Sequence, residues 1–409
     1  MHAAEAQTFS FLKWERQTNS PFYVNSTAIS ADGQRVVAGT FYHVYTPLMA
    51  EPAPALESNQ FGTYCYDGDG TPLWADMFEG YEGVYSVAIS GEGHVAASGG
   101  WFSNTPTLQG FVRAYDVENG PDNILDYRLG ERVNALALSS DGSFLVAAAD
   151  DVYLFQQSGG VFSDEPAKLG LASPPAGSTI PNSAQAVAIT SDGSWILAGD
   201  YYGNLYLVEN DNGSFGTQYV WSDTTALTTI HAIAMTPDGQ WFAVAGGGPA
   251  STVYLFSNTS MTLGPPTYAG TYTLDTGGRV GWVAITDDGA MLSAIGNEGK
   301  AGAVVAIKND QGTLSKIWEQ ATQHNPNSTS MDASGNFVSV ADGYPDGNPG
   351  SFSLYDGATG DLMWSYPTPN MNWPMFVSAD GSGIAAGTDG GAVYYFTPSK
   401  STETESDED

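Results

Sequence analysis

Histidine is the side chain best suited to proton transfer at neutral pH, and the chain contains five of them. Only His231 stands in a repeated context, as the second residue of the strand-forming segment 230–236. Spacing fixes no carboxylate near it, and the sequence has no HExxH, CxxC or G-x-S-x-G motif. His231 is therefore predicted to be a hydrogen-bonded structural residue, with a general base as the alternative.

Three other features carry reactive residue types, and each is explained more simply by structure. Cys65 alternates with its neighbours in a strand pattern, so we expect one buried thiol and no intrachain disulfide. Segment 296–302 (GNEGKAG) lacks the Ser or Thr that follows the lysine of a phosphate loop. The Asp-rich turns at 66–70 and 210–213 are expected to serve the backbone, with calcium binding as the alternative. We predict no metal and no cofactor.

The strongest candidate for a binding site is a set of positions that recur along the chain. The second residue of each repeated strand is polar or aromatic in seven of eight cases: Asn25, Tyr85, Asn134, Gln185, His231, Gly281, Asn327 and Trp373. Nearby aromatic residues extend this set: Trp282, Tyr42, Trp101, Tyr201, Tyr202 and Tyr344. Aromatic faces and amides suit sugars, peptides or extended polar ligands. The alternative is that strands beginning beside a water-filled channel simply start with polar residues.

The strands that position these residues come from a repeated hairpin. Strands such as AQAVAIT (184–190) end in a turn centred on Asp-Gly, and its glycine recurs as Gly33, Gly93, Gly142, Gly193, Gly239, Gly289, Gly335 and Gly381. Successive glycines are 60, 49, 51, 46, 50, 46 and 46 residues apart, a period typical of propellers and other repeat arrays. Asp-Gly between alternating segments predicts a hairpin in which both central turn residues have positive φ.

Eight copies of this unit predict an all-β fold, a single eight-bladed β-propeller with four-stranded blades over residues 1–400. Period 2 places a large residue such as Ile189 on one strand face and a small one such as Ala188 on the other. Residues 8–18 lack a hairpin partner, and the last repeat, 372–398, has only three strands. We expect segment 8–18 to complete that last blade and close the ring. The acidic segment 401–409 is predicted to be a disordered tail.

Two sets of motifs resemble known propeller families. Segments 236–241 (TPDGQW) and 30–33 (SADG) resemble the S-P-D-G turn of WD40-like and TolB-like propellers. Segments 354–364 (LYDGATGDLMW) and 65–74 (CYDGDGTPLW) resemble the tryptophan-docking repeat of PQQ-type propellers. The Trp-Asp dipeptide of WD40 repeats is absent, and one cysteine cannot supply the adjacent cysteines of PQQ-dependent dehydrogenases. The resemblance therefore implies architecture and no cofactor.

Charge and composition limit the kinds of partner that the protein can have. The 409 residues include 45 acids and 12 bases, and the formal net charge of −33 repels nucleic acid and anionic membranes. No segment reaches the roughly 18 apolar residues of a membrane span. The first residues, MHAAEAQ, lack the apolar part of a signal peptide and resemble the start of a processed precursor. We expect a secreted, periplasmic or cell-surface protein.

These observations favour an exported, non-catalytic binding or scaffolding propeller. Long loops after the second strands, at 41–60 and 101–109, would gather at the channel mouth and engage a protein or glycan there. One alternative is a propeller enzyme, a polysaccharide lyase or hydrolase, with its site near His231. Another is a structural subunit of a cell-surface assembly. The oligomeric state is left open.

Overall fold

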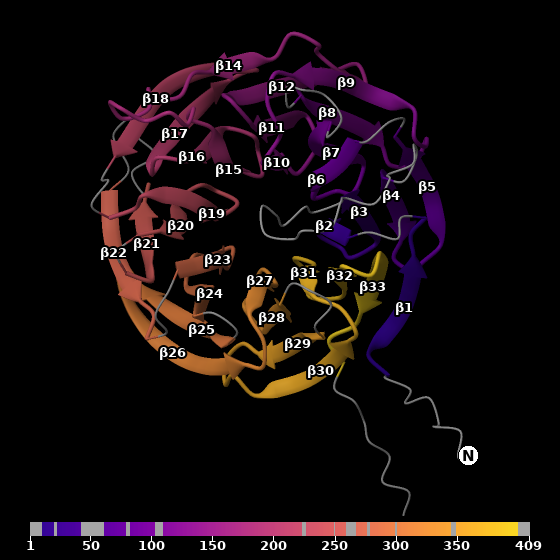
Figure 1. Cartoon of the computed structure of the whole chain (residues 1–409), viewed down its shortest axis with the longest axis vertical. Helices are drawn as coiled ribbons and strands as arrows, with labels where there is room; N and C mark the ends of the chain where they lie inside the picture. The colour runs from indigo at the N-terminus through magenta and orange to yellow at the C-terminus, as the bar shows by residue number, and fades with distance from the viewer. Residues whose placement is uncertain are drawn as a thin grey trace, which may run out of the picture.

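The computed structural model confirms an eight-bladed β-propeller (Figure 1). The structure describes residues 10–19, 23–41, 61–78, 82–102, 109–222, 226–248, 250–258, 267–275, 279–298, 301–344 and 349–399. Their secondary structure consists of 33 strands in eight antiparallel sheets arranged around a central axis. No helix within these ranges is long and apolar enough to cross a membrane.

Each blade runs from an inner strand at the channel to an outer strand at the rim. The inner strands are β2 (Tyr23–Ile29), β6 (Glu82–Ile89), β10 (Ala135–Leu138), β15 (Ala184–Ile189), β19 (Thr229–Met235), β23 (Arg279–Ile285), β27 (Pro326–Met331) and β31 (Asn372–Val377). The second strands are β3 (Arg35–Phe41), β7 (Val95–Phe102), β11 (Phe144–Ala148), β16 (Trp195–Asp200), β20 (Trp241–Gly247), β24 (Met291–Glu298), β28 (Phe337–Asp342) and β32 (Ile384–Thr388).

The third and outer strands complete the blades. The third strands are β4 (Gly62–Asp67), β8 (Gln109–Asp116), β12 (Val152–Ser158), β17 (Asn204–Asp211), β21 (Thr252–Ser257), β25 (Ala301–Asp310), β29 (Gly350–Asp356) and β33 (Ala392–Phe396). The outer strands are β5 (Pro72–Met77), β9 (Asn123–Leu129), β14 (Ala167–Leu169), β18 (Ser214–Ser222), β22 (Thr267–Thr273), β26 (Thr313–Thr322), β30 (Leu362–Thr368) and β1 (Leu12–Gln17). In the third blade the short β13 (Val161–Phe162) also pairs with β12, which gives that sheet five strands.

The turn between the first two strands differs from the predicted type. Its eight glycines have φ between 68° and 75°, but none of the preceding acids or serine has positive φ. The prediction of two positive-φ residues was therefore wrong, and only the glycine needs the left-handed region. In the first blade Asp32 Oδ1 instead accepts bonds from Ser30 Oγ (2.6 Å) and Gln34 N (3.0 Å). Aspartate is favoured there because its side chain caps the turn.

The same turns join neighbouring blades. Seven backbone hydrogen bonds run from one turn to the next: Ala31 N to Gly91 O, Glu92 N to Ser140 O, Ser140 N to Ser191 O, Ser191 N to Pro237 O, Asp287 N to Ala333 O, Ala333 N to Ala379 O, and Asp380 N to Ala31 O. The last of these bonds connects the eighth blade to the first. The end of the propeller that carries these turns is therefore held by backbone contacts at seven of the eight junctions between blades.

The predicted closure of the ring by the N-terminal segment is confirmed. Strand β1 pairs antiparallel with β33, from Leu12 opposite Phe396 to Gln17 opposite Ala392. Thr18 N donates to Gly391 O (2.9 Å) at one end of this pairing, and Thr397 N donates to Phe11 O (2.8 Å) at the other. Figure 1 shows β1 beside β33 at the rim. The pairing covers what would be an open sheet edge.

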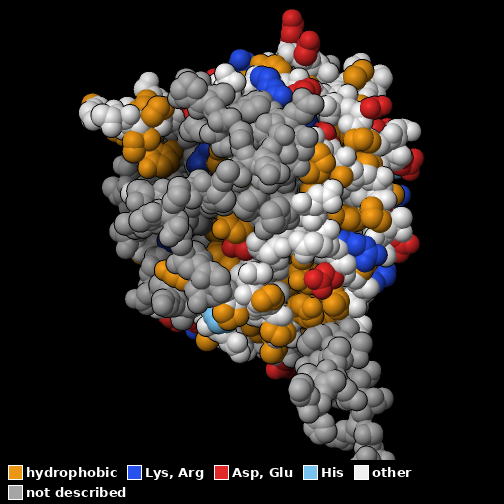
Figure 2. Space-filling model, turned by 45° about the vertical axis from the view of Figure 1, so that its right-hand side comes forward, with side chains coloured by type: hydrophobic (Ala, Val, Ile, Leu, Met, Phe, Trp, Pro, Cys, Tyr) orange, Lys and Arg blue, Asp and Glu red, His pale blue; other side chains and the backbone are white. Residues whose placement is uncertain are grey.

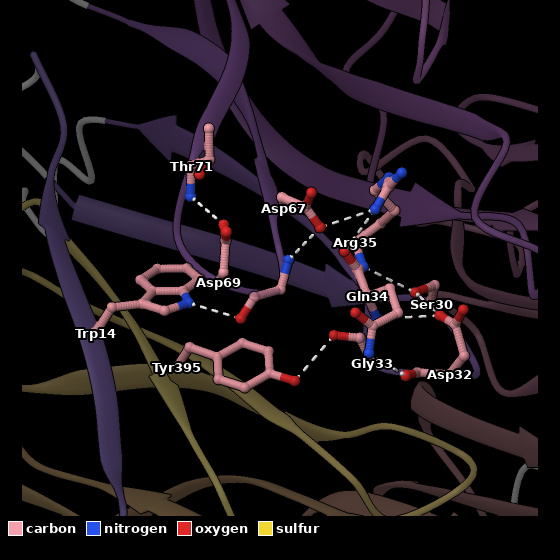
Figure 3. Close-up of polar contacts among 11 residues, drawn as sticks. Trp14, Ser30, Asp32, Gly33, Gln34, Arg35, Asp67, Asp69, Thr71 and Tyr395 are labelled. Carbon is pink, nitrogen blue, oxygen red and sulfur yellow. Dashed lines mark hydrogen bonds and ion pairs between the residues drawn. The ribbon is translucent and has the colours of Figure 1, made fainter.

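Tryptophans in the outer strands dock onto the following blade. Trp14 Nε1 donates to Gly68 O (3.1 Å), and its ring lies 5.4 Å from that of Tyr395, whose hydroxyl donates to Gly33 O (Figure 3). The indoles of Trp74 and Trp318 bond in the same way to Val117 O (3.0 Å) and Gly357 O (2.7 Å). Each docked indole thus adds a directed bond to the packing between sheets.

At the seam the docking pattern changes. The last blade has no chain turn between its third and outer strands, because β33 and β1 come from opposite ends of the described chain. Trp364, which occupies the docking position there, stacks on Phe11 with ring centroids 4.5 Å apart and planes 7° apart. Its buried Nε1 finds no acceptor among the described residues. The seventh blade is therefore joined to the eighth by ring stacking rather than by an indole hydrogen bond.

The hydrophobic core lies between neighbouring sheets. One cluster joins the first two blades through Val37, Cys65, Trp74, Val84 and Phe111. Cys65 is fully buried as expected, and burial raises the pKa of its thiol to about 12. Such a thiol is unreactive at neutral pH. On the exterior side that carries β1 and β5, Figure 2 shows hydrophobic, acidic and basic side chains interspersed.

Candidate functional site

The predicted ring positions coincide with a repeated irregularity of the inner strands. In seven of the eight inner strands the pairing with the second strand shifts at the ring position, for example between Val24 and Ser26 and between Ile230 and Ala232. Such bulges leave one residue out of the ladder and re-aim its side chain. All eight ring residues are half-buried, so this end of the channel is lined by partly accessible groups.

The predicted alternation of large and small residues holds after the bulge, where Ile285 and Ala284 pack in different hydrophobic clusters. A strict period of 2 across the bulge would place Val280 and Val283 on opposite faces of β23, yet both pack in the same cluster. The skipped residue, Gly281, advances the strand by one position between them. Alternation therefore holds only after the bulge.

The ring amides contact the neighbouring blade. Asn25 Nδ2 donates to Tyr85 O (2.8 Å), and Asn134 Nδ2 donates to Ala184 O (2.7 Å). Asn327 Nδ2 repeats this contact with Asn372 O (2.7 Å). Inner strands are sheet edges with unused backbone groups, and these amides satisfy some of them. Gln185 differs, since its Nε2 donates to Ser183 Oγ of its own blade. The three asparagine amides are thus partly committed to structure.

Aromatic residues of the first two blades form one cluster with an arginine of the third. Tyr85 and Trp101 have centroids 5.4 Å apart, and Phe41 at the end of β3 lies 4.4 Å from Trp101. The Arg132 guanidinium stands over both larger rings, 5.7 Å from the Tyr85 centroid and 5.5 Å from that of Trp101. Because cations are attracted to aromatic faces, the rings hold this guanidinium at the mouth.

Arg132 has no acidic partner among the described residues, unlike three of the six arginines of the chain. Arg35 pairs with Asp67 at 2.8 Å, and Arg113 pairs with Asp76 at 3.2 Å. Within the described ranges, Arg132 and Arg279 form no ion pair. These two arginines occupy the same place in the third and sixth repeats, directly before the first buried valine of the inner strand. That shared position was the sequence signal that our prediction missed.

His231 is half-buried in the ring, and no described carboxylate is hydrogen-bonded to it. Burial, with a smaller effect from the positive charge of Arg279, lowers the pKa of its imidazole to about 4. His231 is therefore neutral at pH 7. The orienting acid that a general base needs is not present among the described residues.

The remaining predicted aromatic residues that the structure describes lie outside the cluster of Tyr85, Trp101 and Arg132. Trp282 contacts Phe376 of the eighth blade, with centroids 5.9 Å apart, so it lies inside the channel. Tyr201 packs edge-on against Tyr202 at 5.2 Å, and the Tyr202 hydroxyl donates to Ile180 O (2.6 Å) of the Pro-rich loop. Tyr344 is half-buried after β28. Tyr42 and most of the two long loops, 42–60 and 103–108, lie outside the described residues. The predicted aromatic residues within the described ranges therefore lie in several local clusters, and the described residues do not join them into one surface.

A half-buried acid beside Trp373 was not foreseen. Asp389 lies in the turn between β32 and β33, where its N–H donates to Met371 O (2.9 Å). Its Oδ1 is buried and has no partner among the described residues. Burial raises the pKa of this carboxyl to about 7, against a smaller opposing effect from a hydrogen bond to the Trp373 side chain.

This acid predicts a specific pH dependence of stability. Because the pKa is raised in the folded state, the contribution of Asp389 to stability is complete below about pH 4 and is lost as the pH rises through about 7, by at most about 1.4 kcal/mol per pH unit. In Asp389→Asn this loss should be absent, so denaturation curves at pH 4 to 8 should diverge from wild type. Parallel curves would contradict the assignment.

A matched variant at Asp288 should show a pH dependence of stability of the opposite sign. Hydrogen bonds from Ala290 N and the Thr286 side chain lower the pKa of Asp288 in its turn. Its contribution is therefore present above the unfolded pKa and lost as the pH falls below it. In Asp288→Asn, the loss of stability relative to wild type should be complete near neutral pH and should shrink only as the pH falls below the unfolded pKa.

Fold and site together define a β-propeller with a partly accessible channel mouth. No family model matches the chain, and no curated protein matches it. Three solved structures share the fold, each at 14% identity.

The first is the Dos1 propeller, with a TM-score of 0.65 over 94% of this chain and 93% of that one. The second is the Cps50 (Swd1) β-propeller domain of Myceliophteria thermophila, with a TM-score of 0.56 over 77% and 96%. The third is Sqt1 of Chaetomium thermophilum, solved bound to the N-terminus of the ribosomal protein L10, with a TM-score of 0.67 over 92% and 97%. At this identity the likeness shows the fold alone.

Proposed function

We propose that this protein is an exported, non-catalytic binding or scaffolding propeller that engages a protein or glycan through its channel-mouth face. The observation that carries the proposal is the half-buried cluster of Tyr85, Trp101 and Arg132. Aromatic rings and arginine are the residue types most enriched where binding energy concentrates. Sqt1 supports a protein ligand, since that propeller was solved with a peptide segment bound.

Two finer features belong to the same proposal. Export is supported by the scarcity of lysine and arginine, 12 in 409 residues, and by a single cysteine that is buried. A PQQ-like origin of the repeats, without the cofactor, is supported by the docking of Trp74 and Trp318 on the next blade. Neither feature requires catalysis. The enzyme alternative gains no support from His231, which lacks an orienting acid among the described residues.

The test blocks one face at a time. Because Cys65 is buried and unreactive, a single added cysteine can be coupled selectively to polyethylene glycol maleimide. Tyr201→Cys places the polymer on the mouth face, and Ala358→Cys, in the turn between β29 and β30, places it on the opposite face. Protein and glycan arrays are then probed with both conjugates.

We expect the conjugate at position 201 to lose its ligands and the conjugate at 358 to retain them. Equal loss in both conjugates would move the site away from the mouth. An array without any specific ligand at any salt concentration would refute the binding function itself.

A further inference from the structure

We infer that Arg132, held by Tyr85 and Trp101, is a carboxylate-binding site for a peptide segment of a partner protein; this inference rests on the proposed function. The guanidinium is half-buried and forms no ion pair or hydrogen bond within the described ranges. Arginine presents its N–H groups in a planar fork that fits a carboxylate through two parallel bonds. An arginine positioned by rings and lacking an acid retains this capacity.

The elements around Arg132 fix its position. Its neighbour Val133 donates to Gly100 O (3.3 Å), which ties the start of the third inner strand to β7 of the previous blade. Tyr85 is the bulged residue of β6, and its backbone oxygen accepts the Asn25 amide of the first blade. Three blades therefore meet at the guanidinium. A site anchored in this way loses little conformational entropy when a ligand binds.

The arrangement of the aromatic side chains around Arg132 favours a peptide over a sugar as the ligand. A sugar would stack on an open aromatic face, but the guanidinium stands over the faces of both Tyr85 and Trp101. The two rings are also inclined at 46° to each other, and Phe41 stands at 86° to Tyr85. These rings make a cup around a cation rather than a flat platform. The N–H groups of the guanidinium have no partner among the described residues, so their capacity to bind a carboxylate is unused.

The net negative charge of the protein makes binding of an acidic peptide a specific test of this inference. With a net charge of −33, the surface repels acidic peptides at long range. Non-specific attraction therefore cannot produce binding of an anionic probe, and any such binding must come from a local cation. Arg132 is half-buried beside two aromatic rings, so its pairing is worth more than that of a fully exposed arginine.

The experiment uses the full chain and arrayed octapeptides of varied sequence. Each peptide is made with a free or an amidated C-terminus, and with Asp and Glu or with Asn and Gln. Oligogalacturonides are included as acidic sugars. Wild type should select peptides that carry a carboxylate, and amidation or amide replacement should weaken binding at least tenfold. Whichever change has this effect identifies a terminal or a side-chain carboxylate as the source.

Variants then test whether Arg132 is the cation that binds the peptide carboxylate. Arg132→Ala should weaken peptide binding at least tenfold, and Arg132→Lys should fall between, since lysine keeps the charge without the fork. The matched control is Arg279→Ala, at the same repeat position without a ring stack, and it should stay within twofold of wild type. Unfolding curves of all variants show whether a loss reflects folding.

Each contrary outcome overturns a definite statement. Peptide binding that ignores the carboxylate, or equal binding by Arg132→Ala, refutes this inference. If array proteins still bind and the polymer at position 201 blocks them, the proposed function survives that refutation. Oligogalacturonide binding that depends on Arg132, without peptide binding, replaces the peptide with an acidic glycan. A wild type that binds neither peptides nor array proteins or glycans removes both proposals.

Discussion

A chain that begins at residue 19 is expected to lose more than about 5 kcal/mol of unfolding free energy, because removing a buried tryptophan alone costs about 3–5 kcal/mol. Residues 10–18 contribute Trp14, which is 5% exposed, Phe11, which is 3% exposed, and the pairing of β1 with β33. Their removal leaves the β33 edge open, so the truncated protein should also aggregate. Chemical denaturation and light scattering measure the two effects.

Moving residues 10–18 to the C-terminal end tests whether stability depends on the pairing of β1 with β33 or on the position of β1 in the chain. Thr397 N and Phe11 O are hydrogen-bonded, so a short turn can join residue 398 to residues 10–18 placed at the C-terminal end. This rearranged chain should recover wild-type stability, because it makes the last blade like the others. A synthetic peptide of residues 8–18 should likewise bind the truncated protein and raise its unfolding temperature. A truncated chain that is monomeric and as stable as wild type would show that the seam contributes little.

Repeat count and closure were accessible from the sequence because they depend on local chemistry. Asp-Gly turns such as Asp192-Gly193 recur at nearly constant spacing, and only a glycine holds the required positive φ. Segment 8–18 lacked a hairpin partner and the last repeat had only three strands, which placed β1 in the last blade. The error in the turn type arose because the dipeptide does not reveal loop length. A capping aspartate serves a longer turn equally well.

The site was only partly predictable because it depends on contacts between blades. The ring positions followed from repeat alignment, but the bulge at residues such as Asn25 and His231 gives no signal in an alternating pattern. Tyr85 and Arg132 are 47 positions apart in the numbering, and packing of the second blade against the third brings them together. Asp389 was missed for the same reason, since its pKa depends on burial at the seam blade.

A second large effect is expected from Asp200→Ala, about 3–5 kcal/mol, since several buried donors would lose one acceptor. Asp200 is fully buried at the end of β16. Its carboxylate accepts bonds from Asn182 Nδ2 (2.7 Å), Tyr202 N (2.9 Å), Asn204 N (2.8 Å), Asn204 Nδ2 (2.8 Å) and Tyr206 Oη (2.8 Å). A buried ion with this many donors is stable, but donors left behind without it are not.

The same network holds the Pro-rich loop over the fourth blade. Asn182 Nδ2 also donates to Ala172 O (2.9 Å), and Ala172 N donates to the Tyr206 hydroxyl (2.9 Å). Asp200→Ala should therefore speed hydrogen exchange at Ala172, Tyr202 and Asn204 more than in distant blades. Tyr206→Phe removes one donor to Asp200 and the acceptor of Ala172 N but keeps the ring and the carboxylate, so it should cost less, about 1–2 kcal/mol. Unchanged exchange around the loop, despite a global loss of stability, would show that Asp200 supports the sheet and not the mouth.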